Sequence, residues 1–125
     1  MKRWVTLAIF GAAIAAGEPA AAQDVANGET VFRRCRACHA AGPGARNKAG
    51  PQLNGVVGRK AASVPGFDYS DALKEKAAAG LTWTEPNLTA YLMAPDTFVP
   101  GGVMAFGGIK DQKQLKDLIA FLKTK

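Results

Sequence analysis

The sequence contains very little histidine and cysteine. His39 is the only histidine among 125 residues, and Cys35 and Cys38 are the only cysteines. A closed structural zinc site typically needs four such ligands, so these counts argue strongly against one. A disulfide between Cys35 and Cys38 would close too short a loop to stabilise a domain. We therefore expect neither zinc nor a disulfide framework to hold this fold together.

Long hydrophobic runs are also missing. The apolar stretch at residues 5–17 spans 13 residues, whereas about 20 are needed to cross the hydrocarbon core of a bilayer. Two basic residues precede this stretch and three alanines end at residue 22, which is typical of a cleaved signal peptide. An uncleaved membrane anchor is the alternative. We predict a signal peptide over residues 1–22, export to the periplasm, and one mature domain over residues 23–125.

The composition belongs to an ordered domain with many loops. Hydrophobic residues make up 48% of the chain and charged residues 21%, which excludes disorder caused by composition. The 14 glycines and seven prolines favour long loops. The formal net charge is +6, but the basic residues are scattered, so we expect no nucleic-acid binding.

Four segments have the hydrophobic spacing of helices, and no segment has the alternation typical of strands. The expected helices are residues 25–36, 71–79, 84–94 and 111–125. Asp24, Ser70 and Thr84 are the residue types that cap helix N-termini, and each stands at the start of one expected helix. The chain is therefore predicted to be all-α, with four helices joined by long Gly/Pro-rich loops.

The segment Cys35-Arg36-Ala37-Cys38-His39 is the C-x-x-C-H pattern that attaches a c-type haem. At a helix end, two cysteines at this spacing lie on one side and can form thioether bonds to the two vinyl groups of the macrocycle. His39 would then be held against the iron as its proximal ligand. A thioredoxin-like dithiol is the alternative, but it needs a preceding strand that the sequence does not predict.

The second axial ligand cannot be a histidine, because the chain has no other. Met93, Met104, a lysine, water and an open position are the alternatives. Met93 falls within an expected helix, where a methionine usually fills the core. Met104 falls in a glycine-rich loop, 65 residues after His39. The spacing favours Met104 over Met93 and leaves the choice open.

Several further stretches match the ordered motifs of one known family. They are residues 32–39, 50–59, 65–72, 81–83, 91–92, 100–106 and 117–122. On these residues the chain resembles the class I c-type cytochromes, in particular the soluble bacterial relatives of mitochondrial cytochrome c. The resemblance implies a small cytochrome c fold, wrapped around one haem c that is bound covalently through Cys35 and Cys38.

The resemblance also implies roles for single residues. Met104 matches the sulfur ligand of the iron, which strengthens the case for it. Pro51 matches the residue whose carbonyl accepts a hydrogen bond from the proximal histidine, a contact that fixes the orientation of the ring. Tyr91 matches the phenol that donates to the methionine sulfur.

Other matching residues concern the rest of the haem surroundings. Arg59, Tyr69 and Trp83 match the groups around the inner haem propionate, and Phe106 matches an aromatic near the exposed haem edge. Without the resemblance, these residues would be read as a surface arginine, a half-buried tyrosine and core aromatics. Gly28 matches the point where the first and last helices cross.

The chain departs from the family pattern at a few positions. Gly102 and Val103 stand where relatives usually have threonine and lysine before the sulfur ligand. Leu73 stands where an asparagine is common, and Asp96 falls where mitochondrial cytochrome c has lysine. These changes are expected to alter the reduction potential and to remove positive charge near the haem edge.

The implied function is one-electron transfer by a monomer with His39 and Met104 as axial ligands. Such a carrier shuttles between membrane-bound complexes, such as a quinol–cytochrome c reductase and a terminal oxidase or photosynthetic reaction centre. A haem enzyme or small-ligand sensor with a labile sixth position is the alternative. Because the chain is basic, we expect acidic partners to dock on the positive residues near the haem edge. Those residues are Arg34, Arg36, Lys110 and Lys113.

Overall fold

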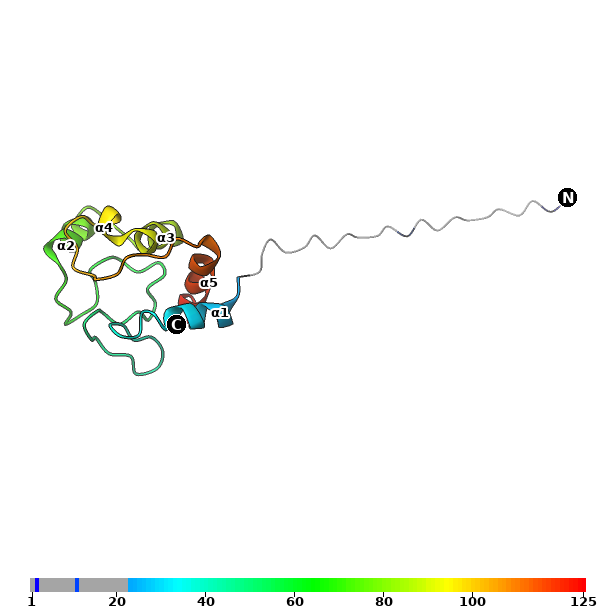
Figure 1. The fold of residues 1–125 in the computed structure, drawn as a ribbon, viewed down its shortest axis with the longest axis horizontal. Helices are drawn as coiled ribbons and strands as arrows, with labels where there is room; N and C mark the ends of the chain where they lie inside the picture. Colours follow the sequence, from blue (N-terminus) through cyan, green and yellow to red (C-terminus); the bar gives the residue numbers. More distant parts are fainter. Residues whose placement is uncertain (1, 3–10, 12–22) are drawn as a thin grey trace.

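The computed structural model describes Lys2, Gly11 and residues 23–125. The predicted signal peptide therefore lies outside the described residues, apart from two isolated positions. The described part contains five helices, coloured along the sequence in Figure 1. They are α1 (Val25–Phe32), α2 (Asp71–Ala78), α3 (Glu85–Met93), α4 (Pro95–Phe98) and α5 (Gln112–Leu122).

The helix starts are set by local hydrogen bonds that the sequence predicts. The side chains of Asp24, Ser70 and Thr84 each accept a backbone N–H three residues further on, at the starts of α1, α2 and α3. Gly80, two residues after the end of α2, has a φ of +100°, a conformation that glycine adopts without steric cost. All three predicted N-caps are confirmed.

Three helix predictions need correction, and one of them is the last helix, which ends at Leu122 rather than at residue 125. The first helix ends at Phe32 rather than at Arg36, because the following N–H groups bond three residues back, in tight turns. The arginines and the alanine of residues 33–37 are good helix formers, so their side chains do not reveal this change of hydrogen bonding. The short helix α4 was not predicted, and its four residues follow α3 after the single residue Ala94.

The N-terminal and C-terminal helices pack closely at one end of the molecule (Figure 1). A Cβ atom placed on Gly28 would lie 1.9 Å from the backbone oxygen of Asp117, so this contact requires glycine. The rings of Phe32 and Phe121 pack beside it, with centroids 5.2 Å apart. The predicted crossing of the first and last helices at Gly28 is confirmed.

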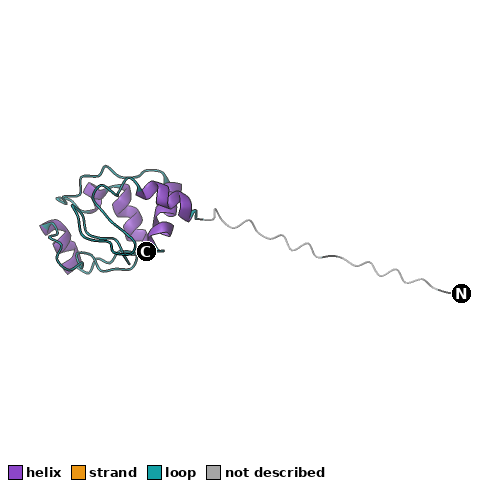
Figure 2. Cartoon of the chain, turned by 90° about the horizontal axis from the view of Figure 1, so that it is seen from below, coloured by secondary structure: helices purple, strands orange, loops and turns teal. Residues whose placement is uncertain are grey.

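Loops make up most of the remaining chain, and residues 23–125 contain helices and loops without a strand (Figure 2). An isolated bridge joins Lys60 to Thr82. The same loop is tied to the start of α3, because Trp83 N–H donates to the Arg59 carbonyl at 2.8 Å. Among the described helices, none is long and apolar enough to cross a membrane.

Candidate metal centre

The C-x-x-C-H segment follows α1 as a pair of tight turns. The N–H groups of Cys38 and His39 both donate to the Cys35 carbonyl, at 3.1 and 2.9 Å. The two cysteines are not joined in a disulfide; Cys35 is half-buried and Cys38 is exposed. Burial raises the pKa of the Cys35 thiol, and nearby Arg34 partly offsets this effect. Among the described residues, no cluster of three or more His, Cys, Asp or Glu side chains could hold a metal ion by itself.

His39 is held in a fixed orientation by the loop that follows it. Its Nδ1 lies 2.8 Å from the Pro51 carbonyl oxygen, and Gly50 N–H donates to the Cys38 carbonyl at 2.8 Å. Gly50 packs against the imidazole so closely that a Cβ atom there would lie 2.4 Å from His39 Cε1. Burial lowers the pKa of His39, although the hydrogen bond to Pro51 opposes the shift. The neutral imidazole, which binds metals, is therefore favoured.

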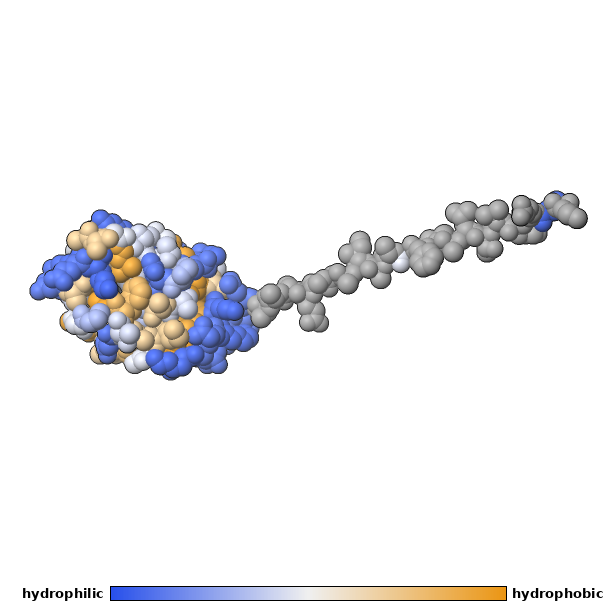
Figure 3. Space-filling model, turned by 90° about the horizontal axis from the view of Figure 1, so that it is seen from above, coloured by the Kyte–Doolittle hydropathy of each residue, from blue (hydrophilic) through white to orange (hydrophobic). Residues whose placement is uncertain are grey.

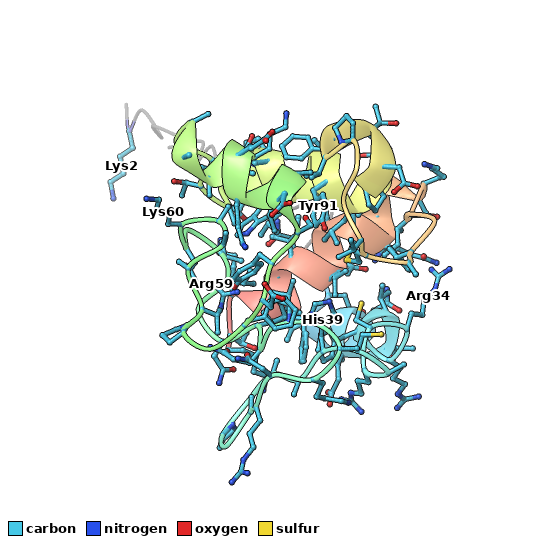
Figure 4. All side chains as sticks on the ribbon, turned by 90° about the vertical axis from the view of Figure 1, so that its left-hand side faces the viewer. Lys2, Arg34, His39, Arg59, Lys60 and Tyr91 are labelled. Atoms are coloured by element: carbon cyan, nitrogen blue, oxygen red, sulfur yellow. The ribbon has the colours of Figure 1, made fainter. Side chains whose placement is uncertain are left out.

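Met104 lies beside Tyr91 of α3. The phenol of Tyr91 donates to Met104 Sδ across 3.7 Å, as the resemblance implied. Burial, together with the negative charge of Asp96, raises the pKa of Tyr91, so this phenol stays protonated and can donate. The ring of Tyr91 packs on that of Trp83, with centroids 4.8 Å apart. Figure 4 shows Tyr91 and His39 on different elements, both toward the middle of the view.

Met93 has different surroundings. It is part of the last turn of α3, and its sulfur lies 3.3 Å from the side-chain amide of Gln112, which donates to it. Its side chain is half-buried and packs against the core. The sulfur of Met93 therefore has a hydrogen-bond partner at the start of α5. These surroundings fit the core role that the sequence predicted for this residue.

Arg59, Tyr69 and Trp83 were predicted to surround a haem propionate. Arg59 Nη1 donates to the carbonyls of Gln52 and Asn54 at 3.1 and 3.0 Å. Its Nε is buried and has no hydrogen-bond partner among the described residues. Trp83 is 6% exposed. A buried cationic donor without a partner fits an anionic group at this place.

The phenol of Tyr69 accepts a hydrogen bond from Val64 N–H at 3.0 Å, and its ring packs edge-on against Phe67. Its oxygen can still donate, because a phenol is both donor and acceptor. The donor set as a whole comprises two thiols, an imidazole, a thioether and a guanidinium. This set fits a covalently attached haem better than a bare metal ion.

Comparisons with known proteins agree with this geometry. The sequence model described as Cytochrome c matches residues 25–125. The chain belongs to the cytochrome c family. Cytochrome c2 of Blastochloris viridis is 48% identical over 117 residues, which cover 92% of this chain and 90% of that protein. As members of this family carry one covalent haem c, so does this chain, and the protein is an electron-transfer protein rather than an enzyme.

Solved structures of cytochromes share the fold. The structure of cytochrome c2 from Rhodospirillum centenum is similar with a TM-score of 0.77 and 39% identity, covering 81% of this chain and 97% of that one. Cytochrome cH from Methylobacterium extorquens gives a TM-score of 0.74 with 47% identity, over 82% of this chain and 99% of that one. The predicted small, all-α cytochrome c fold is confirmed.

The basic residues expected at the docking face of this cytochrome differ in their surroundings. Arg34 is exposed and lies at the edge of the molecule in Figure 4. Arg36 is paired with Glu29 at 3.5 Å, and Lys113 with Asp117 at 2.6 Å. Lys110 donates to the carbonyl of Met93. The contacts just described involve the charged groups of Arg36, Lys113 and Lys110, but not that of Arg34.

The departures from the family pattern have different surroundings. Val103 is 78% exposed and directly precedes Met104. A Cβ atom on Gly102 would lie 3.1 Å from the Val99 carbonyl, so a larger residue would need a small shift there. Leu73 is half-buried and packs against the core.

In Figure 3, apolar side chains cover much of the middle of one face, and hydrophilic ones cover its margins.

Two positioning features were missed by the sequence reasoning. Gly50 touches the imidazole, and its place directly before Pro51 is the only sequence signal for this contact. Asp117 is 1% exposed and joins α5 to the start of α1. Its role is hidden in the sequence, because its hydrogen-bond partners Asp24 and Asn27 are 93 and 90 residues away.

Proposed function

We propose that this cytochrome is a periplasmic one-electron carrier in which His39 and Met104 are the axial ligands of the haem iron. The observation that carries the proposal is the placement of the two donor side chains. Nδ1 of His39 faces the Pro51 carbonyl at 2.8 Å, and the sulfur of Met104 faces the Tyr91 phenol at 3.7 Å. Both ligand side chains are thus oriented by the protein itself.

The contact with Pro51 selects the tautomer of His39. A carbonyl oxygen only accepts, so Nδ1 carries the proton and Nε2 keeps the free lone pair that a metal needs. Burial lowers the pKa of His39, which keeps the ring neutral near pH 7. Gly50 supports the same orientation from the face of the ring.

The contact with Tyr91 orients the sulfur of Met104. A neutral thioether favours ferrous iron and gives a high reduction potential. The Tyr91 phenol stays protonated because burial raises its pKa, and its hydrogen bond reduces the electron density on the sulfur. Met93 lies in the last turn of α3, and its sulfur accepts from Gln112 at the start of α5 instead of from the phenol of Tyr91.

The guanidinium of Arg59 would neutralise a buried haem propionate. Backbone carbonyls of Gln52 and Asn54 hold the guanidinium from one side, which leaves Nε to donate to an anion. Trp83 and Tyr69 would lie beside the same propionate, as the resemblance implies. Bound haem c supplies an Fe(III)/Fe(II) couple that takes up and releases a single electron. The protein binds and orients this group.

The proposed export and partners follow from the sequence and the family. We propose that residues 1–22 are cleaved as a signal peptide, and that the mature chain is a monomer working in the periplasm. Its donor would be a quinol–cytochrome c reductase, and its acceptor a terminal oxidase or photosynthetic reaction centre. An intact mass equal to residues 23–125 plus one haem would support cleavage and attachment, and retention of Met1 would contradict them.

The ligand assignment is tested with matched methionine variants. Met104→Ala should abolish the far-red Fe(III)–sulfur absorption band of the oxidised protein and lower its reduction potential. Met93→Ala should retain the band and lose roughly 2–5 kcal/mol of stability at most, because its side chain is half-buried. The opposite pattern would assign the sulfur ligand to Met93. A five-coordinate spectrum in the unmodified protein would favour a ligand sensor or haem enzyme instead.

A further inference from the structure

The segment that carries Met104 has little internal structure. Residues 99–109 contain neither helix nor strand. At its start, Gly102 N–H donates to the Val99 carbonyl at 3.0 Å, and in its middle Phe106 N–H donates to the Met104 carbonyl at 2.9 Å. These bonds are local, so they do not fix the segment relative to the rest of the protein.

The end of this segment, by contrast, is held on the last turn of α3 by several contacts. Ile109 N–H donates to the Leu92 carbonyl at 2.9 Å. The backbone of Gly108, where φ is +101°, runs so close that a Cβ atom would lie 2.2 Å from the Met93 carbonyl oxygen. The Lys110 ammonium group donates to that same oxygen.

The Lys110 contact has a clear electrostatic basis. The last carbonyls of a helix lack intrahelical partners, and the C-terminal end of a helix attracts cations. The last turn of α3 contains no basic residue of its own. Lys110 supplies this charge from outside the helix, and its exposed side chain contributes little to the core.

We propose that Lys110 is a positioning residue for Met104. By bonding the Met93 carbonyl, it pins the end of residues 99–109 to α3, the same helix whose Tyr91 holds the Met104 sulfur. Tyr91, which contacts the sulfur, and Met93, whose carbonyl accepts from Lys110, are two residues apart on α3. Displacing Met104 from the iron then requires the segment to move while the hydrogen bond between Lys110 and the Met93 carbonyl holds its end. The proposal rests on the proposed ligation of iron by Met104.

The experiment measures how easily an external ligand displaces Met104. Imidazole is titrated into the oxidised holoprotein, and binding is followed by loss of the far-red Fe(III)–sulfur band. Lys110→Met should bind imidazole about fivefold to tenfold more tightly than the wild type, the effect of one charge-assisted hydrogen bond. Lys110→Arg should restore wild-type affinity within about twofold, since its guanidinium can also donate to the carbonyl.

Two further variants complete the design. Lys116→Met removes the same charge from an exposed position on α5 and should leave imidazole binding unchanged. Gln112→Ala removes the contact to the Met93 sulfur, 3.3 Å long, and should strengthen imidazole binding by about twofold to threefold. It provides an independent measurement if Lys110→Met folds poorly. No redox partner is present, so a docking role of Lys110 cannot produce these effects.

Failure of this proposal is distinguishable from failure of the ligand assignment. If folded Lys110→Met binds imidazole as the wild type does, the positioning role of Lys110 is wrong, whatever Gln112→Ala shows. Equal shifts in Lys110→Met and Lys116→Met would show an effect of net charge, which also overturns it. If the far-red band survives in Met104→Ala, the ligand assignment itself fails.

Discussion

Replacing Asp117 with asparagine should destabilise the folded protein in a pH-dependent way. The Asp117 carboxylate is 1% exposed and accepts from Asp24 N–H at 2.9 Å, the Asn27 amide at 2.8 Å and the Lys113 ammonium at 2.6 Å. It thereby joins the start of α1 to α5. Asparagine has the same shape but loses the charge, and its amide nitrogen cannot accept from a donor.

The pKa of Asp117 indicates the size of this effect. The hydrogen bond from Lys113, followed by that from Asp24 N–H, lowers this pKa from 3.8 to about 2. Such a shift corresponds to roughly 2 kcal/mol of stability. Water around the Lys113 side chain, which is 62% exposed, screens the pair, so about 1–2 kcal/mol is expected.

The pH dependence has a definite sign. Because the folded-state pKa lies below that of the unfolded chain, the folded state binds this proton less tightly. The stabilisation is complete above about pH 5, shrinks as the pH falls through 3.8 and is lost near pH 2. The difference in stability between wild type and Asp117→Asn should therefore be largest at neutral pH and vanish in acid.

Urea unfolding of the holoprotein, followed by far-UV circular dichroism between pH 3 and pH 7, measures this difference. Protonation of other groups affects both proteins equally and cancels. Asp68→Asn is the matched control, since this carboxylate is also near a lysine, Lys74 at 3.7 Å, but its side chain is 99% exposed. It should change stability by less than about 0.5 kcal/mol. Equal stabilities of wild type and Asp117→Asn at pH 7, or a difference independent of pH, would refute the reasoning.

Three further changes test other contacts. Gly28→Ala places a Cβ atom 1.9 Å from a backbone oxygen of α5 and should cost about 1–3 kcal/mol in chemical unfolding; an unchanged midpoint would contradict the helix crossing. Gly50→Ala pushes on the His39 ring, so spectroscopic acid titration should show its iron bond breaking at higher pH than in the wild type. Electron transfer to an acidic partner should slow with salt, less in Arg34→Glu and more steeply in Val103→Lys; salt-independent rates in all three proteins would indicate apolar docking.

Much of this fold is predictable because its signals are short-range. The N-caps Asp24, Ser70 and Thr84 act within three residues, so the helix starts follow from the sequence. The end of α1 does not, because the change to tight turns after Phe32 depends on hydrogen-bond geometry rather than on residue type. Long-range contacts are equally hidden, and the pairing of Asp117 with the start of α1 is the main example.

The candidate site likewise has residues that local motifs predict and residues that only long-range contacts reveal. The C-x-x-C-H motif and Pro51 are close in sequence, and the contact between His39 and Pro51 spans 12 residues. Met104 could be favoured from its loop and from the family motifs, but the sequence does not tell which element fixes that loop. The answer is the last turn of α3, through Lys110 and Gln112, neither of which belongs to a recognisable motif.

The two sides of the proposed iron site therefore differ in how they are held. On the His39 side, the covalent thioethers and the packed backbone at Gly50 keep the ligand in place without help from distant residues. On the Met104 side, a neutral thioether depends on one phenol and on a loop whose end is fixed by α3. A weak ligand on a segment without helix or strand is the more easily perturbed of the two. Substitutions that change the reduction potential or ligand exchange should consequently concentrate around α3 and residues 99–112, whereas substitutions at the α1–α5 contact should change stability and leave the potential nearly unaffected.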